Sequence, residues 1–517
     1  MGIVARQGFL SGINLLLGFA IGAFNQMVLI PYVFEEGWPR ELFGLLQLII
    51  TLSVVFAQFL NFGAISIAVR FMPRYRSENR EGELHFYSWF FPFVGMVLLA
   101  LFLLFFGEAF LSEVVLRESD DQLLSGVIDL GFLVLILFLN SFFMSYFRSL
   151  NGLAVANFYN TLGSFFNEVY IRIVQIGGVL LFAAGKLDFR ELFVFYTLSY
   201  ASQFLLMFFM VGGFRLLRIK TPESRSEFHE VSGYGLFAVL DSGAGILVNR
   251  IDVIMIGMLV GLSEVVYYQM AFFMATVISI PSRSLGNVSS AVVSESYHRQ
   301  DWYNIQKLYH SNSLIQTLGG GWIFLLIWVN MESLISLLPP EFSIIRWPFL
   351  FLGLSKFFDL ITSINGTIIS LTPHFRYNFY FNVVLLVLSV IVNLALIPIW
   401  GISGAAIATA ISICAFNVMK AVFLMRKYAL TPFKRSALIS VFVLILVGLL
   451  GWWIPDVLSP ADQEIKSRIL PVLVNITVRS LAVSFVLFLL IRQLGLFNEL
   501  ASIAPKIARR IGFKTND

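Results

Sequence analysis

Charged side chains lie inside one of the most apolar stretches of this chain. The segment "LDSGAGILVNRIDVIMIG", from Leu240 to Gly257, contains Asp241, Arg250 and Asp252. A charge that faces lipid costs at least about 2.5 kcal/mol, so each of these side chains is expected to face protein or a water-filled cavity. A carboxylate in such a place can bind a proton or a cation, and an arginine can bind a phosphate.

The spacing of these residues predicts how one continuous helix would present them. Successive residues of a helix turn by about 100°, so Asp241 and Asp252 would lie within about 20° of each other and about 16 Å apart along the axis. Arg250 would point nearly the opposite way, and it has no acidic neighbour three or four residues away. Its partner must therefore come from another helix or from a ligand.

A second polar stripe lies in the segment 155–184. Asn160, Asn167, Glu168, Arg172 and Gln175 recur at spacings that place them on one side of a helix. Glu168 and Arg172 are four residues apart and can pair with each other. Such a pair either neutralises itself inside the protein or lines a polar pathway.

The segment 345–371 repeats this pattern. Lys356 and Asp359 are three residues apart, and Ser363 and Thr367 continue the stripe. The same two interpretations apply: an internal ion pair, or part of a hydrophilic cavity shared with the other two segments.

The composition identifies the elements that must position these residues. The 517 residues are 58% hydrophobic and only 13% charged, with a mean hydropathy of +0.84, whereas a soluble protein has about 25% charged residues. The single cysteine, Cys414, excludes an internal disulfide, and no cluster predicts a metal site. No nucleotide-binding loop is present, so ATP is not expected to drive the protein.

Apolar stretches of about 20 residues predict membrane-spanning helices. We identify fourteen, at about 9–34, 42–69, 89–107, 123–147, 155–184, 191–217, 233–260, 264–286, 311–338, 345–371, 378–398, 402–425, 436–455 and 469–491.

The charges of the connecting segments predict the orientation. With the N-terminus inside, 23 Lys and Arg residues fall on the cytoplasmic side, Arg148 among them, and seven on the other side. Because Lys and Arg accumulate in cytoplasmic loops, both termini are predicted to be cytoplasmic. The net charge of +4 belongs to these loops beside anionic lipid and does not predict nucleic acid as a partner.

The segments that begin at Asn25 and Asn249 are similar to each other. "NQMVLIPYVFEEGWPRELFGLLQLIITL" and "NRIDVIMIGMLVGLSEVVYYQMAFFMATV" share an Asn, an apolar stretch, a Glu and then a Gln. Chance similarity between apolar helices is the alternative to a parallel repeat. With a repeat, the predicted divisions are an N-terminal lobe at 1–218, a linker at 219–232, a C-terminal lobe at 233–430, two further helices at 431–492 and a basic cytoplasmic tail at 493–517.

One stretch carries a family resemblance. "NLALIPIWGISGAAIATAIS", from Asn393 to Ser412, combines Asn, Ile-Pro, a turn Gly and Gly-Ala-Ala, and "LIPYVF" at 29–34 and "NFGAISIAVR" at 61–70 extend the match. The chain thereby resembles the polysaccharide transporters (Wzx-type lipid-linked oligosaccharide flippases) of the multidrug/oligosaccharidyl-lipid/polysaccharide (MOP) exporter superfamily. It departs from the pattern where Val266 precedes Tyr267, because these proteins often have Gly before that Tyr.

The resemblance implies an all-α integral membrane protein. Two six-helix lobes and two C-terminal helices would surround a central cavity that opens alternately to each side. The protein would move an undecaprenyl-diphosphate-linked oligosaccharide from the inner to the outer leaflet of the bacterial inner membrane. Membrane lipids and the polysaccharide polymerase machinery are the other candidate partners.

The charged residues can then be given candidate roles. A proton or sodium gradient is the expected energy source, with no other cofactor, and Na⁺ could bind at the coupling acids. The candidates are, for the diphosphate and sugars, Arg250, Arg172, Lys356, Asn160, Asn167 and Gln175, with Tyr170 and Tyr267 as aromatic contacts, and, for ion coupling, Asp241, Asp252, Glu168 and Asp359.

Two other functions are compatible with the same pattern. A multidrug/toxin extruder of the same superfamily would need an acid-lined, aromatic pocket for organic cations, and the cations within the spans disfavour it. A membrane glycosyltransferase or O-antigen polymerase would be an enzyme with a sizeable outer loop, which the short outer loops disfavour. We therefore expect a transporter and no enzymatic activity.

Overall fold

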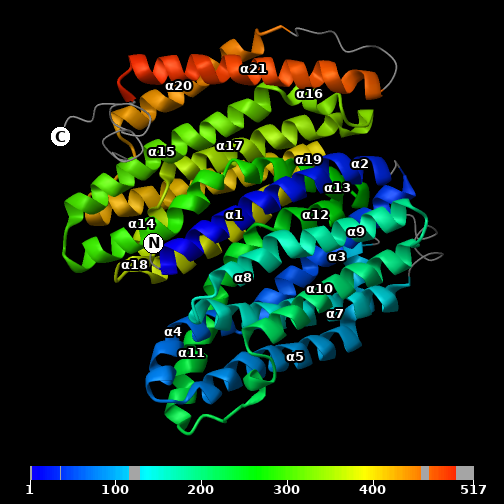
Figure 1. The fold of residues 1–517 in the computed structure, drawn as a ribbon, viewed down its shortest axis with the longest axis vertical. Helices are drawn as coiled ribbons and strands as arrows, with labels where there is room; N and C mark the ends of the chain where they lie inside the picture. Colours follow the sequence, from blue (N-terminus) through cyan, green and yellow to red (C-terminus); the bar gives the residue numbers. More distant parts are fainter. Residues whose placement is uncertain (1–2, 35–36, 116–128, 456–464, 497–517) are drawn as a thin grey trace. The chain divides into compact units, whose positions relative to one another are not determined.

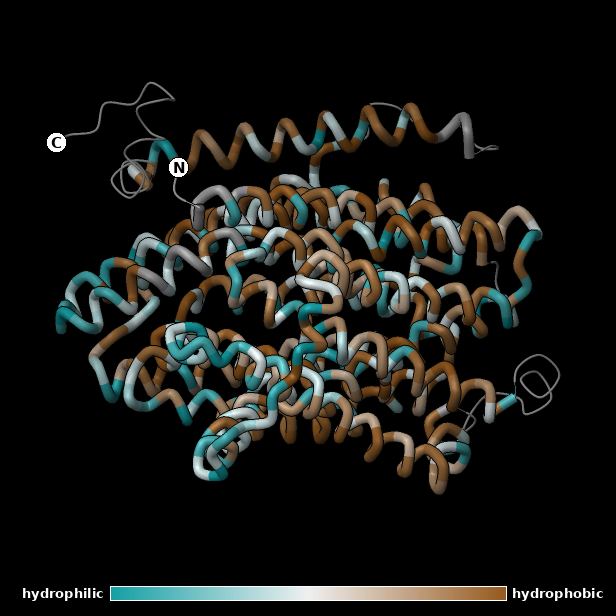
Figure 2. Tube along the Cα trace, turned by 60° about the horizontal axis from the view of Figure 1, so that its bottom comes forward, coloured by the Kyte–Doolittle hydropathy of each residue, from teal (hydrophilic) through white to brown (hydrophobic). Residues whose placement is uncertain are grey.

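Helices are the only regular secondary structure in the part of the chain that the computed structural model describes, which is 3–34, 37–115, 129–455 and 465–496. Eleven of the described helices are long and apolar enough to cross a membrane. Figure 2 shows hydrophobic residues along the helices and hydrophilic residues gathered at helix ends and connections. The prediction of an all-α, multi-pass membrane protein is confirmed.

One of these eleven helices covers two of the predicted spans. The helix α19 (Arg376–Tyr428) covers the predicted spans 378–398 and 402–425, which are separated by a bend at Gly401 with φ 56° and ψ −135°. Glycine accepts this left-handed φ without the steric cost of a side chain. The fold thus turns where the Gly-Ala-rich sequence predicts a connection.

Two more predicted spans are shorter helices in the structure. The spans 264–286 and 345–371 correspond to α13 (Leu262–Val277) and α17 (Arg346–Thr362), which have 16 and 17 residues. Each is shorter than the roughly 20 residues that cross a bilayer. Fourteen crossings therefore stay a prediction.

The chain divides into two compact units. Unit 1 comprises Met1–Gln269 and Ile397–Ile402, and unit 2 comprises Met270–Leu396 and Ser403–Asp517. The helices that carry Asp241, Arg250 and Asp252 thus belong to unit 1, whereas the predicted lobes placed them after the linker at 219–232. Most of the predicted tail, from 497 onward, lies outside the described residues, as does the connection 116–128.

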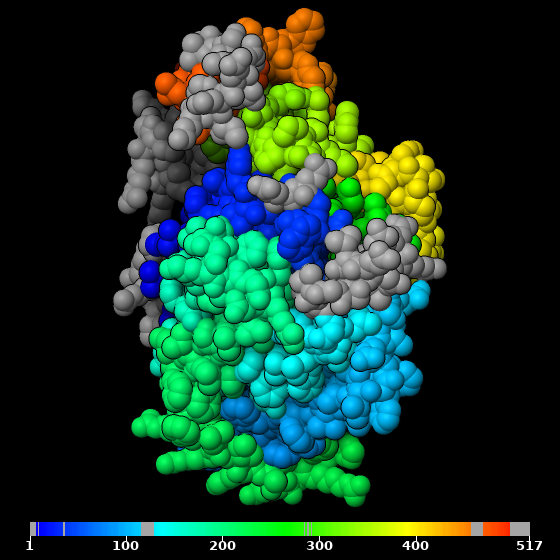
Figure 3. Space-filling view, turned by 90° about the vertical axis from the view of Figure 1, so that its right-hand side faces the viewer, coloured from blue at the N-terminus to red at the C-terminus, as the bar shows by residue number. Residues whose placement is uncertain are grey.

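Unit 1 is built around one helix, α7, which packs against α3, α4, α5 and α10 (Figure 1). Figure 3 shows the side chains of this unit, coloured blue to green, packed closely over one face. Its elements are α1 (Ile3–Ala23), η1 (Phe24–Leu29), α2 (Ile30–Val33), α3 (Trp38–Leu60), α4 (Ala64–Ser77), α5 (Glu81–Val115), α7 (Leu130–Ala156), α8 (Asn160–Phe165), η2 (Phe166–Tyr170), α9 (Ile171–Ala183), α10 (Phe189–Val211), η3 (Gly213–Leu217), α11 (Arg225–Val248), α12 (Ile251–Leu259) and the first half of α13.

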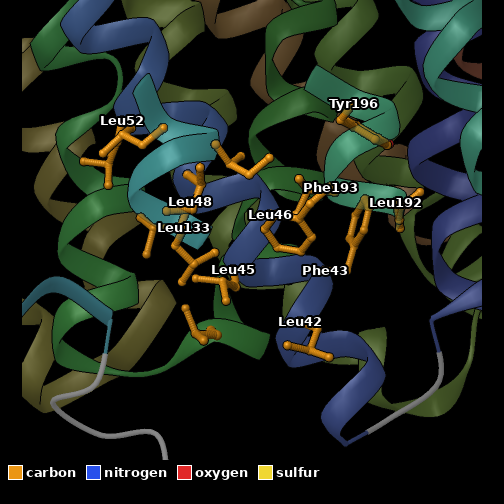
Figure 4. Close-up of a cluster of buried hydrophobic side chains, with 14 of the residues drawn as sticks. Leu42, Phe43, Leu45, Leu46, Leu48, Leu52, Leu133, Leu192, Phe193 and Tyr196 are labelled. Atoms are coloured by element: carbon orange, nitrogen blue, oxygen red, sulfur yellow. The ribbon is translucent and has the colours of Figure 1, made fainter. Parts of the chain in front are cut away.

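Leucine and phenylalanine side chains fill the centre of unit 1. Leu45 and Leu48 on α3 and Phe193 on α10 are fully buried in this cluster, together with Leu133 on α7 (Figure 4). Inside a membrane, helices are held together by such van der Waals packing rather than by exclusion of water. The cluster fixes α3, α7 and α10 relative to one another.

Two glycines let α11 approach the junction of α3 and α4. Gly63 has φ +74°, and a Cβ atom there would lie 2.4 Å from the carbonyl oxygen of Gly235 on α11. A Cβ atom on Gly235 would lie 2.7 Å from the carbonyl oxygen of Phe62. Neither position has room for a side chain, so the backbones are in direct contact and α11 is held along α3.

Unit 2 is organised around α15, which packs against α14, α17 and α20. Helices α20 and α21 form a pair at the C-terminal end of the described chain (Figure 1). Its elements are the second half of α13, α14 (Ile280–His298), α15 (Trp302–Val329), α16 (Met331–Ile335), η4 (Pro340–Ile345), α17, α18 (Asn365–Leu371), α19 apart from Ile397–Ile402, α20 (Arg435–Trp452) and α21 (Ile465–Gln493).

The predicted polar segments are interrupted helices. The predicted span 233–260 is broken between Val248, where α11 ends, and Ile251, where α12 begins. Asp241 and Asp252 therefore lie on different helices, and the shared face predicted for one continuous helix does not exist across this break. The segment 155–184 contains the π-helical turn η2, and the segment 345–371 is broken at Ser363, whose φ is 55°.

Candidate anion-binding site

Arg250 lies at the break between α11 and α12. Asn249 ends α11, and its side-chain Nδ2 donates a hydrogen bond to the carbonyl oxygen of Gly245 at 2.7 Å. Arg250 has φ −123° and ψ −16° and is half-buried. Within the described parts of the chain, its guanidinium group has no hydrogen-bond or ion-pair partner. The helix break thus holds a cation whose guanidinium donors are not used by the described residues.

A second arginine, Arg148, lies near this break. It is eight residues before the end of α7 and donates a hydrogen bond to Oε1 of Gln58 on α3. The Nε2 atom of Gln58 in turn donates to Oγ of Ser242 on α11 at 2.8 Å. This chain of hydrogen bonds connects α7, α3 and α11 and fixes the position of Arg148.

The two guanidinium groups form a site of uncompensated positive charge. Arg148 and Arg250 are close enough to repel each other electrostatically, and Arg250 also interacts with Tyr200 on α10. The Tyr200 hydroxyl accepts a hydrogen bond from Nε2 of Gln175 at 3.1 Å. No described carboxylate lies within ion-pair distance of either arginine. Two like charges in a low-dielectric interior are costly unless an anion joins them.

The acids of the predicted span 233–260 have different surroundings. Asp252 is only 3% exposed and accepts a hydrogen bond from the Tyr268 hydroxyl at 2.7 Å. Asp241 is half-buried on α11. Both belong to unit 1, like Arg250, but neither forms an ion pair with it.

Glu168 and Arg172 form the ion pair that their spacing predicts. Nη2 of Arg172 lies 3.0 Å from Oε2 of Glu168, and Arg172 also donates to the carbonyl oxygen of Gly18 on α1. A Cβ atom on Gly18 would lie 2.6 Å from the backbone oxygen of Glu168, so α1 packs directly against η2. In this structure the charge of Arg172 is therefore matched within unit 1.

The residues predicted to contact sugars differ in their exposure and in their hydrogen-bond partners. Asn160 and Asn167 are exposed, and Gln175 bonds to Tyr200 beside Arg250. Tyr267 is 6% exposed and accepts a hydrogen bond from Nη1 of Arg40 at 2.6 Å. Of these residues, Gln175 is the one that the structure places in the Arg148–Arg250 cluster.

Unit 2 contains a separate polar chain. Nδ2 of Asn417 donates to Oδ1 of Asp359 at 3.0 Å, and Oδ1 of Asn417 accepts from Nδ2 of Asn365 at 2.9 Å. Asp359 is exposed, and Nζ of Lys356 lies 5.3 Å from the centre of the Phe272 ring. Oxygen atoms of a carboxylate and amides beside a broken helix are ligands suited to Na⁺.

The structure contains no other candidate for a resident metal in the residues it describes. They include no group of three or more His, Cys, Asp or Glu side chains that could hold an ion. Cys414 is a free thiol within α19.

Sequence reasoning missed three members of the Arg148–Arg250 cluster. Arg148 was placed in a cytoplasmic connection because the predicted span ended at 147, but α7 continues to Ala156. The apolar residues that follow it, in "SLNGLAVA", are the signal that could have extended the span. Gln58 lies on the apolar helix α3 and Ser242 directly follows Asp241 on α11, and nothing in their spacing indicates that they meet.

The fold is shared with known transporters. No protein-family model matches the chain, and no curated protein matches it by sequence. The solved structure of the lipid II flippase MurJ in an inward closed conformation matches with a TM-score of 0.64 at 15% identity, over 91% of this chain and 98% of that one. An inward-facing multidrug resistance MATE family transporter of the MOP superfamily matches with a TM-score of 0.61 at 13% identity, over 80% and 95%. A MATE protein in the bent conformation gives 0.53 at 12%, over 87% and 98%.

The chain therefore has the fold of these flippase and MATE transporter structures. The likeness extends over nearly the full length of each matched chain. These identities are low, so they establish the fold and leave the substrate to the chemistry of the site.

Proposed function

We propose that this protein is a flippase for a diphosphate-linked lipid oligosaccharide. The observation that carries the proposal is the pair Arg148 and Arg250, two neighbouring cations without a described carboxylate partner in the interior of a membrane protein. A diphosphate is the anion that a prenyl-linked oligosaccharide presents, and arginine binds phosphate oxygens with two parallel N–H donors. The MurJ likeness supports a lipid-linked substrate.

The surroundings of the two arginines suit the rest of such a substrate. Tyr200 and Ser242 supply hydroxyl groups, and Gln175 supplies an amide group, for sugar hydroxyls. Arg172 is less suited than Arg250 to hold the diphosphate, because Glu168 and the backbone of α1 already use its donors. The prenyl chain would remain in the lipid.

A multidrug extruder is the alternative, and the likeness to MATE transporters favours it. The charge of the cluster discriminates between the two, because organic cations would be repelled by two arginines and would need carboxylates. The flippase is therefore the function that the site supports better.

An ion gradient is the proposed energy source. The Asp359–Asn417–Asn365 chain in unit 2 offers oxygen ligands for Na⁺, and the buried Asp252 is a second candidate that can take up a proton. Asp359→Asn and Asp252→Asn, together with Asp241→Asn, separate these possibilities in vesicles with an imposed proton or sodium gradient. Loss of gradient-driven transport identifies the coupling acid, and unchanged transport in all three would reject this assignment.

The proposal also implies a membrane and an orientation for the protein. The protein would lie in the bacterial inner membrane with both termini cytoplasmic, beside the polysaccharide polymerase machinery. The substrate would enter from the inner leaflet and leave into the outer leaflet by alternating access.

The test is reconstitution in liposomes with a fluorescent prenyl-diphosphate oligosaccharide. Leaflet accessibility is scored with an impermeant quencher, and a lipophilic fluorescent cation is assayed in the same vesicles. We expect movement of the glycolipid and none of the cation, and loss of movement in Arg250→Ala. Export of the cation without glycolipid movement would replace this function with the extruder alternative.

A further inference from the structure

A cavity lies in unit 2 between the end of α15 and the C-terminal helix pair. It has a volume of about 230 Å³ and is lined by Arg346, Arg479, Glu332, Trp328 and Trp452, among others. These residues come from α15, α16, α17, α20 and α21. The cavity is distinct from the Arg148–Arg250 cluster, which belongs to unit 1.

Arg346 lines this cavity and has N–H donors that the described residues do not use. Its Nη1 lies 2.5 Å from Oε1 of Glu332, and its guanidinium carbon lies 5.5 Å from the centre of the Trp452 ring. Its Nε atom is buried and has no partner among the described residues. A guanidinium group carries five N–H donors, so the salt bridge leaves most of them available to a ligand.

Arg479 is directed toward the same cavity from α21. Its Nε donates to the carbonyl oxygen of Ile454 at 3.2 Å, and its Nη1 lies 3.4 Å from Oγ of Ser333. The neighbouring Ser480 accepts a hydrogen bond from Asn330 at 3.1 Å, which ties α21 to the end of α15. The described residues of the lining include two arginines and one glutamate.

Tryptophans place this cavity at a membrane surface. Trp347, Trp452 and Trp453 are 53%, 59% and 84% exposed, at the start of α17 and at the end of α20. Tryptophan concentrates where the hydrocarbon region meets the headgroups. By the predicted orientation this is the outer face. A phospholipid headgroup is the anion that is always present at that depth.

We propose that this cavity binds the phosphate of an anionic phospholipid, with Arg346 and Arg479 as its donors and Trp328 and Trp452 against the glycerol and upper acyl groups. The lipid would hold the α20–α21 pair against α15. This site does not involve the transport substrate, so its test is independent of the test of the flippase function.

The experiment is native mass spectrometry of the full-length protein in a non-ionic detergent, titrated with phosphatidylglycerol. Arg346→Gln and Arg479→Gln should each weaken binding by about tenfold, because each removes a charge-assisted contact. Arg190→Gln is the matched control, since Arg190 is an exposed arginine of unit 1; it should bind as the parent does. An uncharged diacylglycerol and inorganic phosphate should not compete with the lipid.

Glu332→Gln distinguishes lipid binding from a purely structural role of the two arginines. This change releases Arg346 from its ion pair, so lipid binding should become about two- to fivefold tighter, whereas a structural role predicts weaker binding. Arg346→Lys keeps the charge but loses the planar fork and should bind with intermediate affinity. Equal lipid retention in Arg346→Gln, Arg479→Gln and Arg190→Gln would overturn the proposal, as would competition by inorganic phosphate or weaker binding in Glu332→Gln.

Discussion

Two of the arginine sites inside apolar helices of unit 1 have opposite electrostatic surroundings. Arg172 is joined to Glu168 at 3.0 Å and to the backbone of Gly18, so its charge is matched where it lies. The guanidinium group of Arg250 has no described ion-pair or hydrogen-bond partner, and the side chain of Arg148 beside it bonds, among the described residues, to a neutral amide, Gln58. The same residue type thus serves as an internal pair in one place and as an uncompensated charge in the other.

The two sites differ in what a buried charge contributes to the protein. A buried ion pair adds little net stability over apolar residues, but losing one partner is expensive. A protein that keeps two arginines together without acids accepts a standing electrostatic cost, which an anionic ligand removes when it binds. Function is therefore expected at Arg148–Arg250 and structural roles at Glu168–Arg172.

The largest expected effect is on transport by the uncompensated pair. Arg148→Ala and Arg250→Ala should each slow glycolipid movement by roughly 10- to 100-fold, the loss of one strong charge-assisted contact. Lysine at either position should restore only part of the rate, because it lacks the planar fork. The measurement is initial flipping rate in vesicles at equal protein content. If both alanine variants move the glycolipid at the parental rate, the proposed difference in function between the Arg148–Arg250 cluster and the Glu168–Arg172 pair is wrong.

The second prediction converts one kind of site into the other. Gln58→Glu places a carboxylate where the amide oxygen now accepts from Arg148, and so gives this arginine a partner like that of Arg172. Transport should fall by about tenfold while the thermal midpoint of the purified protein rises, since the electrostatic cost is removed. Gln58→Met, which has similar volume and no charge, is the control. A variant that is neither slower nor more stable would contradict the comparison.

Glu168→Gln tests the matched pair and should act mainly on stability. Arg172 would lose its carboxylate, and we expect about 2–3 kcal/mol less free energy of unfolding, below the fully buried range because the two side chains keep 25% and 23% exposure. The double variant Glu168→Gln/Arg172→Gln should be less destabilised than Glu168→Gln alone. Denaturant titration in detergent checks both. Additive losses would show that the pair is not coupled.

The smallest effect on stability is expected at an ion pair that is exposed to solvent. Nε of Arg76 lies 3.1 Å from Oε1 of Glu81, and the two side chains are 45% and 47% exposed. Arg76→Gln should lower the thermal midpoint by only about 1–3 °C, because exposed ion pairs are screened. The shift should shrink further in 1 M salt, and a shift that persists there would indicate a buried interaction.

Much of the fold could be predicted from the sequence. Apolar length and Gly401 in its Gly-Ala-rich surroundings predicted the helices and the turn within α19, and the four-residue spacing predicted the Glu168–Arg172 pair. These are local properties, since helix periodicity and chain length decide them. The lobe boundaries and the number of crossings stay predictions.

The Arg148–Arg250 cluster could not be found this way. Arg148 and Arg250 are about a hundred residues apart in sequence, and the arginines meet only because α7, α3 and α11 pack together. The break at Asn249 also removed the shared face that was expected for Asp241 and Asp252. Periodicity describes one continuous helix, and it cannot describe a helix that is interrupted.

That this is a membrane protein of many helices with charges buried inside them follows from its residues alone, because the cost of exposing a charge to lipid depends only on residue type. Which charges are matched and which are not is decided by how the helices pack against one another. That decision depends on distances between helices, and these are set by close packing at positions such as Gly63 and Gly235, where the absence of a side chain brings two backbones into contact.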